Sequence, residues 1–562
     1  MRSSGATHRE CLEGTGIALR KTINCWAEGT DLPNILLLMG GAGTGKSTIA
    51  TTIAEEYRRK DRLGSHFLCL KGMSDPTTVI RTFAYNLAVY NQQIAQNIAS
   101  ELRGVELDSS TPKGQFNILL SASLGKAARK DGIDYPVLII LDALDECGTV
   151  DTRKQLVRLL EYEFSTLPPN FRILITSRPE EDIVSLLPSQ SHVHSIMIDQ
   201  RSEDNKQDVL MFIKFEFEHL RKSGRLRVPV DWPWEDSLEA LGEAADGLFI
   251  WASTAIKYIS EKKSDRFTYF KKLVEDASVI NLDDLYVTVL EESLDWDDFT
   301  REIFPEVFSL IFFSKVPLSD KDIDGILYLK EGSTANLLLC LQSLVAYEPG
   351  QPIHVHHASL FDYLTSPSNK EEYWFIDIKY RKQQIVSRCI DLMGRLLKFN
   401  ICKLESSFLL NEDVYDLNER IRDNIPTFLQ YACHNWAQHL KEVPYSDELH
   451  KRLKAFVYSR LLGWFEVLSL TGVFKSCVGS SLIYAMTWIR VSFYPGIRKR
   501  NFTLSLLLYR AKINLYTRFY RMLTDRLVNS VMPFHKVPHT FMFPFLPLQG
   551  MTRVSPISMP NA

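Results

Sequence analysis

The 562-residue chain has no apolar run as long as the roughly 18 residues that a membrane-spanning helix needs. The nearest candidate, residues 467–489, is interrupted by Lys475 and by several small polar residues. The nine cysteines include no Cys-x-x-Cys pair and are irregularly spaced, so we expect reduced thiols rather than a disulfide framework. The first residues contain no apolar segment of the kind found in secretory signals. These absences predict a cytoplasmic protein.

Acidic residues are nearly missing from the C-terminal end. Residues 467–562 contain twelve Lys or Arg and one acid, Asp525, although the whole chain has a net charge of -3. Such a break indicates a change of domain or of sequence origin. A wrong reading frame or a retained intron would explain this tail, and a genuine amphipathic segment that contacts membrane or RNA is the alternative. The overall charge predicts no specific nucleic-acid partner.

What is present points first to an α/β fold. Hydrophobic residues make up 45% of the chain and charged residues 24%, as in folded proteins. Short apolar runs predict five buried parallel strands, namely Ile35–Met39, His66–Leu70, Val137–Leu141, Arg172–Thr176 and Val193–Ile198. Helix-length segments lie between them, namely Lys46–Lys60, Pro76–Asn91, Gln115–Arg129 and Thr152–Leu167. We therefore predict a parallel five-stranded sheet with helices on both faces.

A glycine-rich loop follows the first strand and fits the P-loop pattern GxxxxGK[ST] at every position: Gly40, Gly41, Ala42, Gly43, Thr44, Gly45, Lys46 and Ser47. Main-chain N–H groups of such a loop turn toward phosphate oxygens, and the following helix adds the positive end of its dipole. We expect Lys46 to neutralise the β- and γ-phosphates and Ser47 to bind Mg²⁺, with Thr48 completing the nucleotide contact. The alternative is a glycine-rich turn that binds nothing.

Acidic residues end the third strand. Asp142 follows Val137–Leu141, and phosphate sites in parallel sheets lie at the carboxyl ends of the strands. We expect Asp142 to hold the Mg²⁺ bound by Ser47, and Asp145 or Glu146 to orient or deprotonate the attacking water. The alternative is that these carboxylates are simply solvated at a strand end.

Two further motifs bear on the nucleotide. Arg178 lies just past the fourth strand, where it can reach the γ-phosphate, although it can also be a surface arginine. Residues 205–208, Asn-Lys-Gln-Asp, match the guanine-selecting tetrapeptide NKxD. In GTPases this motif follows its strand directly, whereas here residues 199–204 intervene. We therefore interpret 205–208 as the start of a surface helix and favour ATP over GTP.

Beyond residue 203 the periodicity becomes helical, and an alternating stretch at 352–357 suits a small winged-helix module. No internal repeat of about 20–50 residues is visible. The predicted parts are a helical lead-in at 1–33, a P-loop NTPase domain at 34–202, a helical domain at 203–314, a winged-helix-like domain at 315–370, a second helical domain at 371–472 and a basic tail at 473–562.

Four motifs in order, GGAGTGKS, LIILDALDEC, ILITSRPE and GLFIWASTA, resemble those of the NACHT class of STAND signal-transduction NTPases. The resemblance covers residues 11–470 and is greatest to the fungal type with a nephrocystin-like N-terminal segment. It implies an ATP- or GTP-driven switch in which His357 contacts the phosphates in a closed, ADP-like form. It also implies self-association after nucleotide exchange, in nonself recognition or cell death. Gly16 stands where the family usually has a basic residue, which puts a nucleotide contact there in doubt.

We therefore expect a switch that hydrolyses NTP slowly. Two alternatives remain: a remodelling ATPase that cycles continuously, and a truncated scaffold or decoy that binds partners without signalling.

Overall fold

The computed structural model describes residues 10–491, except 30–31, 71–73, 104, 106, 108–110, 131–132, 134, 263 and 406–409. Residues 492–562, which include most of the segment expected to be a basic tail, lie outside the described residues. The described residues all belong to one structural unit.

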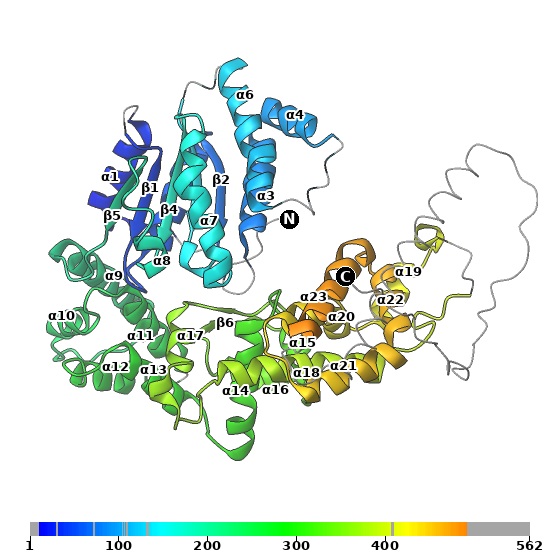
Figure 1. Ribbon diagram of the computed structural model, residues 1–562. Coiled ribbons are helices and arrows are strands. Elements are labelled where there is room, and N and C mark those ends of the chain that lie inside the picture. Colours follow the sequence, from blue (N-terminus) through cyan, green and yellow to red (C-terminus); the bar gives the residue numbers. More distant parts are fainter. Residues whose placement is uncertain are drawn as a thin grey trace, which may run out of the picture. The chain divides into compact units, whose positions relative to one another are not determined.

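The N-terminal half contains a parallel five-stranded sheet in the order β2-β3-β4-β1-β5 (Figure 1). Its strands are β1 (Ile35–Met39), β2 (Leu63–Leu68), β3 (Val137–Asp142), β4 (Phe171–Ser177) and β5 (Val193–Met197). The predicted fold class is confirmed. The second strand starts three residues earlier than expected, because Leu63 already pairs with Leu138. Gly64 permits this, since a Cβ there would lie 2.8 Å from both Leu87 and Val137.

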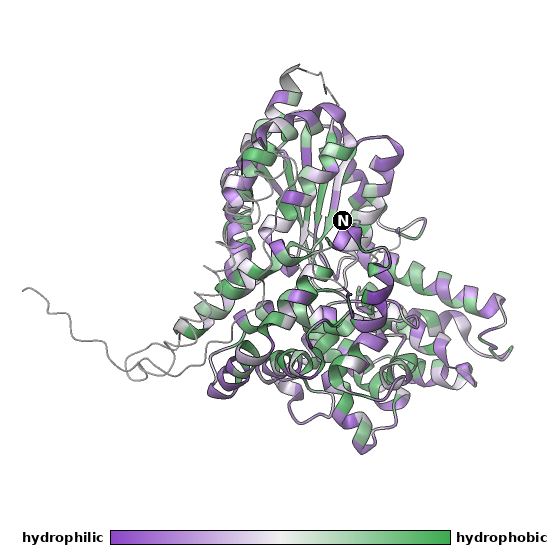
Figure 2. Ribbon diagram, turned by 90° about the vertical axis from the view of Figure 1, so that its right-hand side faces the viewer, coloured by the Kyte–Doolittle hydropathy of each residue, from purple (hydrophilic) through white to green (hydrophobic). Residues whose placement is uncertain are grey.

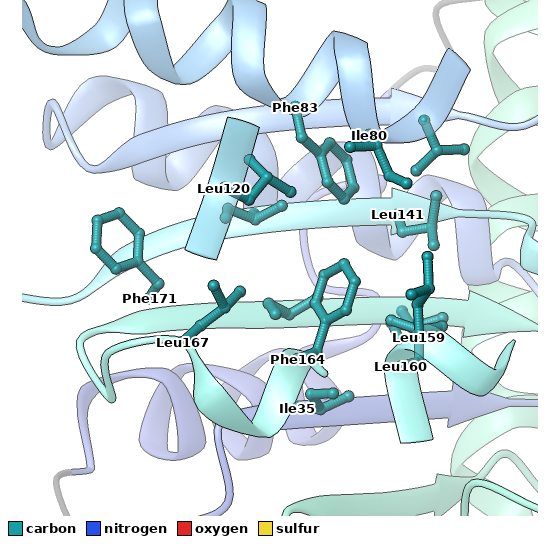
Figure 3. Packing of buried hydrophobic residues seen from close by; sticks show 14 of the residues in the cluster. Ile35, Ile80, Phe83, Leu120, Leu141, Leu159, Leu160, Phe164, Leu167 and Phe171 are labelled. Atoms are coloured by element: carbon teal, nitrogen blue, oxygen red, sulfur yellow. The ribbon is translucent and has the colours of Figure 1, made fainter. Parts of the chain in front are cut away.

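Alternate residues of the central strands face two separate layers of helices. Ile35, Ile139 and Ile173 belong to one apolar cluster, while Leu36 and Ile140 belong to the other. Figure 3 shows the first cluster, in which Phe83 and Phe164 pack against strand residues. A strand buried on both faces needs apolar residues at every position, which explains the continuous runs in the sequence. Figure 2 shows these apolar strands enclosed by helices of mixed hydropathy.

The first layer consists of α3 (Pro76–Tyr90), α4 (Gln92–Glu101), α6 (Ala122–Lys130) and α7 (Val150–Tyr162), and Figure 3 labels Ile80 and Phe83 of α3 and Leu159 and Leu160 of α7. The opposite layer consists of α1 (Ile17–Glu28) and α2 (Lys46–Arg59). The helix expected at 115–129 begins earlier, with α5 (Pro112–Phe116), because Thr111 caps it and Pro112 occupies its first turn. A π-helical turn, Asn117–Ser121, joins α5 to α6. The helix α7 ends at Tyr162, before the predicted Leu167.

After a short α8 (Glu181–Val184) and β5, the chain is helical through Phe313. The helices are α9 (Glu203–Lys222), α10 (Trp234–Ala244), α11 (Phe249–Glu261), α12 (Arg266–Glu275), α13 (Leu282–Ser293) and α14 (Asp298–Phe313). The next stretch holds α15 (Asp320–Leu327), α16 (Ser333–Leu339), a two-stranded antiparallel pair and α17 (Ser359–Leu364). The paired strands are β6 (Val345–Ala346) and β7 (His354–Val355).

The last helices are α18 (Ile378–Leu396), α19 (Leu417–Asn424), α20 (Thr427–Lys441), α21 (Asp447–Ser459), α22 (Leu461–Leu470) and α23 (Phe474–Val491). The helix α23 lies within the segment expected to be a basic tail. It is tied to the preceding helices, since the Trp488 indole N–H donates to the Val443 carbonyl over 2.8 Å. Among the described residues, no helix combines the length and apolar content needed to span a bilayer.

Candidate functional site

The loop between β1 and α2 folds around its own lysine. The Lys46 ammonium donates to the carbonyls of Gly40 over 2.8 Å and Gly41 over 2.7 Å. The Gly40 N–H donates to the Ser177 carbonyl at the end of β4, which fixes the start of the loop to the sheet. Because α2 begins at Lys46, its free N–H groups and its positive dipole end point toward the same place. This is the strand–loop–helix arrangement of a P-loop.

The glycine at position 43 allows a helix to pack directly on the loop. Gly43 has φ of 77°, and a Cβ there would lie 2.1 Å from Ile250 Cγ2. Ile250 and Phe249 begin α11, and Phe249 lies against Gly45 in the same way. The motif GLFIWASTA therefore supplies the helix that packs against the P-loop glycines Gly43 and Gly45.

A hydroxyl and a carboxylate meet at the start of α2. Ser47 Oγ donates to Asp142 Oδ1 over 3.1 Å, and Thr176 Oγ1 also donates to Oδ1. Asp142 is 1% exposed, and its Oδ2 has no hydrogen-bond partner among the described residues. A buried carboxylate oxygen without a partner is costly unless a cation binds it. The hydroxyl of Ser47 and the free oxygen of Asp142 are hard oxygen donors, which fit Mg²⁺.

Asp145 is engaged with Arg178. Asp145 Oδ1 accepts the Arg178 main-chain N–H over 3.0 Å, and Oδ2 lies 3.4 Å from Arg178 Nε. The Arg178 guanidinium also donates to Asp362 Oδ2, on α17. Burial would lower the pKa of Arg178, but its hydrogen bond to Asp362 and the charges of Asp362 and Asp145 raise it. Asp145 therefore orients Arg178, and both predicted acids, Asp145 and Glu146, line the same cavity.

These groups surround a cavity of about 170 Å³ whose lining includes Lys46, Ser47, Glu146, Arg178 and His357. Burial lowers the pKa of the Lys46 ammonium to about 8, although the charge of Asp145 acts to raise it. A partly desolvated ammonium gains from a phosphate, which restores an opposite charge beside it. The cavity thus brings together an ammonium and a guanidinium, the kinds of group that stabilise phosphate charge, and Ser47 in its lining contacts Asp142.

A segment from far along the chain closes one side of this cavity. The Gly43 N–H donates to His357 Nε2 over 3.1 Å. His357 Nδ1 and Ser359 Oγ share a hydrogen bond of 2.7 Å, and the Tyr286 hydroxyl bonds Ser359 Oγ over 2.8 Å. Tyr286 is 2% exposed, so this chain of contacts runs from the core of α13 to the P-loop.

The structure thus places most of the predicted residues together. The cavity is lined by the predicted residues Ala42, Lys46, Ser47, Asp145, Glu146, Arg178 and His357. Asp142 is not in the lining, but it accepts a hydrogen bond from Ser47. Gly43 contacts His357, whereas a Cβ on Gly41 would lie 3.6 Å from Gln200 Oε1. Thr48 is not part of the lining and lies in the first turn of α2.

Sequence reasoning missed Thr176 and Asp362. The signal for Thr176 was weak: it is a polar residue at the end of the otherwise apolar run Ile173–Ile175. We predicted no role for Asp362, because its contact with Arg178 spans 184 positions.

Residues 205–208 do lie in a helix, near the start of α9, but Asn205 is buried and structural. Its amide N–H₂ donates to the carbonyls of Gln200 and Gly247, each over 2.7 Å. Both amide protons are therefore used within the protein.

Comparison with solved structures finds matches at low sequence identity and low structural similarity. A STAND protein with a tetratricopeptide repeat sensor from Pyrococcus horikoshii is 14% identical, with a TM-score of 0.39, over 90% of this chain and 72% of that one. A Walker-type ATPase of Pyrococcus abyssi is 16% identical, with a TM-score of 0.32, over 61% and 93%. The ADP form of the Aeropyrum pernix ORC2 protein is 14% identical, with a TM-score of 0.30, over 66% and 93%. Likeness at this level says nothing about activity.

No curated protein sequence matches the chain. Residues 14–178, which run from the N-terminal segment through the P-loop core to Arg178, match the family described as Nephrocystin 3, N-terminal.

Proposed function

We propose that this protein is a nucleotide-operated switch that binds a nucleoside triphosphate with Mg²⁺, hydrolyses it slowly and couples the nucleotide to contacts between distant segments. The observation that carries the proposal is the 3.1 Å hydrogen bond from the Gly43 N–H to His357, which lies 314 positions later. A loop amide suited to a phosphate oxygen is thereby tied to a separate part of the chain. A phosphate bound at this amide would lie beside His357, so the nucleotide and this distant segment would meet at one place.

Each residue has a role that follows from its surroundings. The P-loop amides and Lys46 would hold the phosphates, and Ser47 with Asp142 would hold Mg²⁺, which when bound neutralises charge on the β- and γ-phosphates. Glu146 would orient the attacking water, while Asp145 keeps Arg178 directed at the cavity. ATP fits better than GTP, because Asn205 already uses both amide protons on main-chain carbonyls.

The wider role rests on the resemblance to fungal NACHT proteins. The helices α15 and α16 with the β6–β7 pair would form the winged-helix domain, residues 315–370. His357 would hold it against an ADP-bound core in the cytoplasm, and exchange to triphosphate would open the protein and permit self-association. Such a device suits nonself recognition or cell-death signalling.

Replacing Lys46 with alanine tests the binding step. Isothermal titration with Mg·ATP and Mg·ADP should show binding by the wild type, and Lys46→Ala should weaken it by about 10- to 100-fold, the effect of losing hydrogen bonds to a charged group. Lys154→Ala is the matched control, since Lys154 is exposed on α7. Equal affinity in all three proteins would rule the P-loop out as the binding site.

Single-turnover kinetics separate a switch from a cycling ATPase. A switch should release phosphate slowly and keep its ADP, so labelled ADP should stay with the protein after hydrolysis. Sustained turnover near one per second or faster, in the range of ordinary enzymes, would favour a remodelling machine instead.

A further inference from the structure

Arg178 is held between two carboxylates from distant parts of the chain. Asp145 follows β3, lies 33 positions before Arg178 and accepts its main-chain N–H, so the two residues meet at the ends of the neighbouring strands β3 and β4. Asp362 lies 184 positions after Arg178, on α17, and accepts from its guanidinium. Asp145 therefore positions Arg178 within the core, and the contact with Asp362 joins Arg178 to α17.

The Arg178–Asp362 pair borders the cavity proposed for the phosphates. Arg178 and Phe361, the neighbour of Asp362, line the same cavity as Lys46 and Ser47. The Asp362 side chain is 40% exposed and that of Arg178 is 21% exposed, so the pair lies at the cavity rim and not in the core. A partly exposed ion pair shifts an equilibrium by only about two- to fivefold, so a stronger ligand for Arg178 can displace Asp362.

The rest of the segment around α17 is seated firmly. Ser359 bonds both His357 and the buried Tyr286, and His357 in turn reaches Gly43. Segment 357–362 thus presents two acceptors to the core, one at the P-loop amide and one at Arg178. Because the two contacts lie at different sites, different phosphates of a nucleotide would meet the Gly43 amide and the Arg178 guanidinium.

We propose that Asp362 is an internal competitor of the γ-phosphate for Arg178, so that a triphosphate breaks the Arg178–Asp362 contact and a diphosphate leaves it intact. The proposal rests on the proposed function. A γ-phosphate carries more negative charge than a carboxylate and offers three oxygens to the planar guanidinium. A nucleoside diphosphate has no group to offer Arg178, which then stays paired with Asp362.

The test measures triphosphate and diphosphate affinities separately. Removing the charge with Asp362→Asn should tighten binding of a non-hydrolysable ATP analogue about two- to fivefold, the worth of a partly exposed pair, and leave ADP affinity unchanged. Glu371→Gln is the control, because Glu371 is an exposed acid a few residues beyond α17. In an Arg178→Gln background, Asp362→Asn should have no further effect on either affinity.

Hydrogen exchange supplies a second readout. Peptides covering 357–366 should exchange faster when the wild type binds the ATP analogue but not when it binds ADP, and Asp362→Asn should raise exchange before any ligand is added. If Asp362→Asn leaves the analogue affinity unchanged, or shifts ADP affinity equally, the competition is refuted while nucleotide binding stands. If the wild type binds neither nucleotide, the proposed function itself fails.

Discussion

Asp142 shows how few side chains define the chemistry of this site. Ser47 and Thr176 both donate to Oδ1, so the other oxygen, Oδ2, is left buried with no partner among the described residues. An apolar pocket would not tolerate such a group, since a buried charge without a partner is strongly unfavourable. The arrangement is understandable if Oδ2 is reserved for a cation.

Thr176 is predicted to position Asp142. Its hydroxyl donates to Asp142 and accepts the Ala143 N–H over 2.9 Å. Thr176→Val keeps the shape but removes both contacts, so the Mg²⁺ concentration needed for half-maximal nucleotide binding should rise about tenfold, the worth of one hydrogen bond to a charged group. Thr334→Val is the control, because the buried Thr334 hydroxyl has no hydrogen-bond partner among the described residues. An unchanged Mg²⁺ midpoint in Thr176→Val would argue against this role.

The buried His439 should make the stability of α20 depend on pH. It is 2% exposed, and burial with the nearby Lys315 lowers its pKa from 6.5 to about 3. Below pH 6.5 the unfolded chain takes up a proton that the folded chain refuses, so stability falls as the pH decreases toward 3. Between pH 7.5 and 5.5 the loss should be about 1 kcal/mol.

Hydrogen exchange of α20 peptides, corrected for the intrinsic rate at each pH, measures this loss. His439→Gln keeps an acceptor for the Tyr431 hydroxyl, which bonds His439 over 2.7 Å, but has no proton to gain. The variant should lack this part of the pH dependence. The same loss in both proteins would show that other groups cause it.

At the scale of elements, the P-loop depends on how α9 and α11 are fixed. Asn205, near the start of α9, ties the loop at Gln200 to Gly247, just before α11. Phe249 and Ile250 follow at once and pack on the P-loop glycines. The tetrapeptide that looks like a guanine-selecting motif is thus part of this scaffold.

A substitution at Gly247 tests this scaffold without changing a P-loop residue. It has φ of 77°, and a Cβ there would lie 2.0 Å from the Gln200 carbonyl oxygen. Gly247→Ala should destabilise the protein by about 1–3 kcal/mol more than Gly224→Ala, the cost of overpacking, and should also weaken nucleotide binding. Gly224 has φ of 71° with nothing within 4 Å of the added Cβ, so it carries the backbone strain alone. Equal thermal unfolding temperatures for the two variants would contradict the packing argument.

The elements of the core were predictable because their signals are local. Strands buried on both faces are apolar at every position, and the P-loop carries its phosphate-binding groups within eight residues. The start of β2 was not predictable, since it is set by pairing with β3 and by the close approach that Gly64 permits. The roles of Asn205 and Asp145 also depend on residues that are distant in sequence.

At the scale of the whole molecule, the site is completed by parts that only folding brings together. His357 contacts Gly43 from 314 positions later in the chain, and Asp362 contacts Arg178 from 184 positions later. The expectation for His357 came from a family resemblance, and no sequence pattern pointed to Asp362. Under the proposed function, a nucleotide at this cavity would change the contacts between these segments.

The most direct test of the central claim is the nucleotide carried through purification. Protein should be purified as wild type, Lys46→Ala and Lys154→Ala, then denatured, and the released nucleotide identified and quantified by ion-exchange chromatography. We expect adenine nucleotide, mostly ADP, at a similar amount per chain in the wild type and Lys154→Ala, and little in Lys46→Ala. Equal content in all three proteins, or a wild type that carries none and binds none when it is added, would contradict the account.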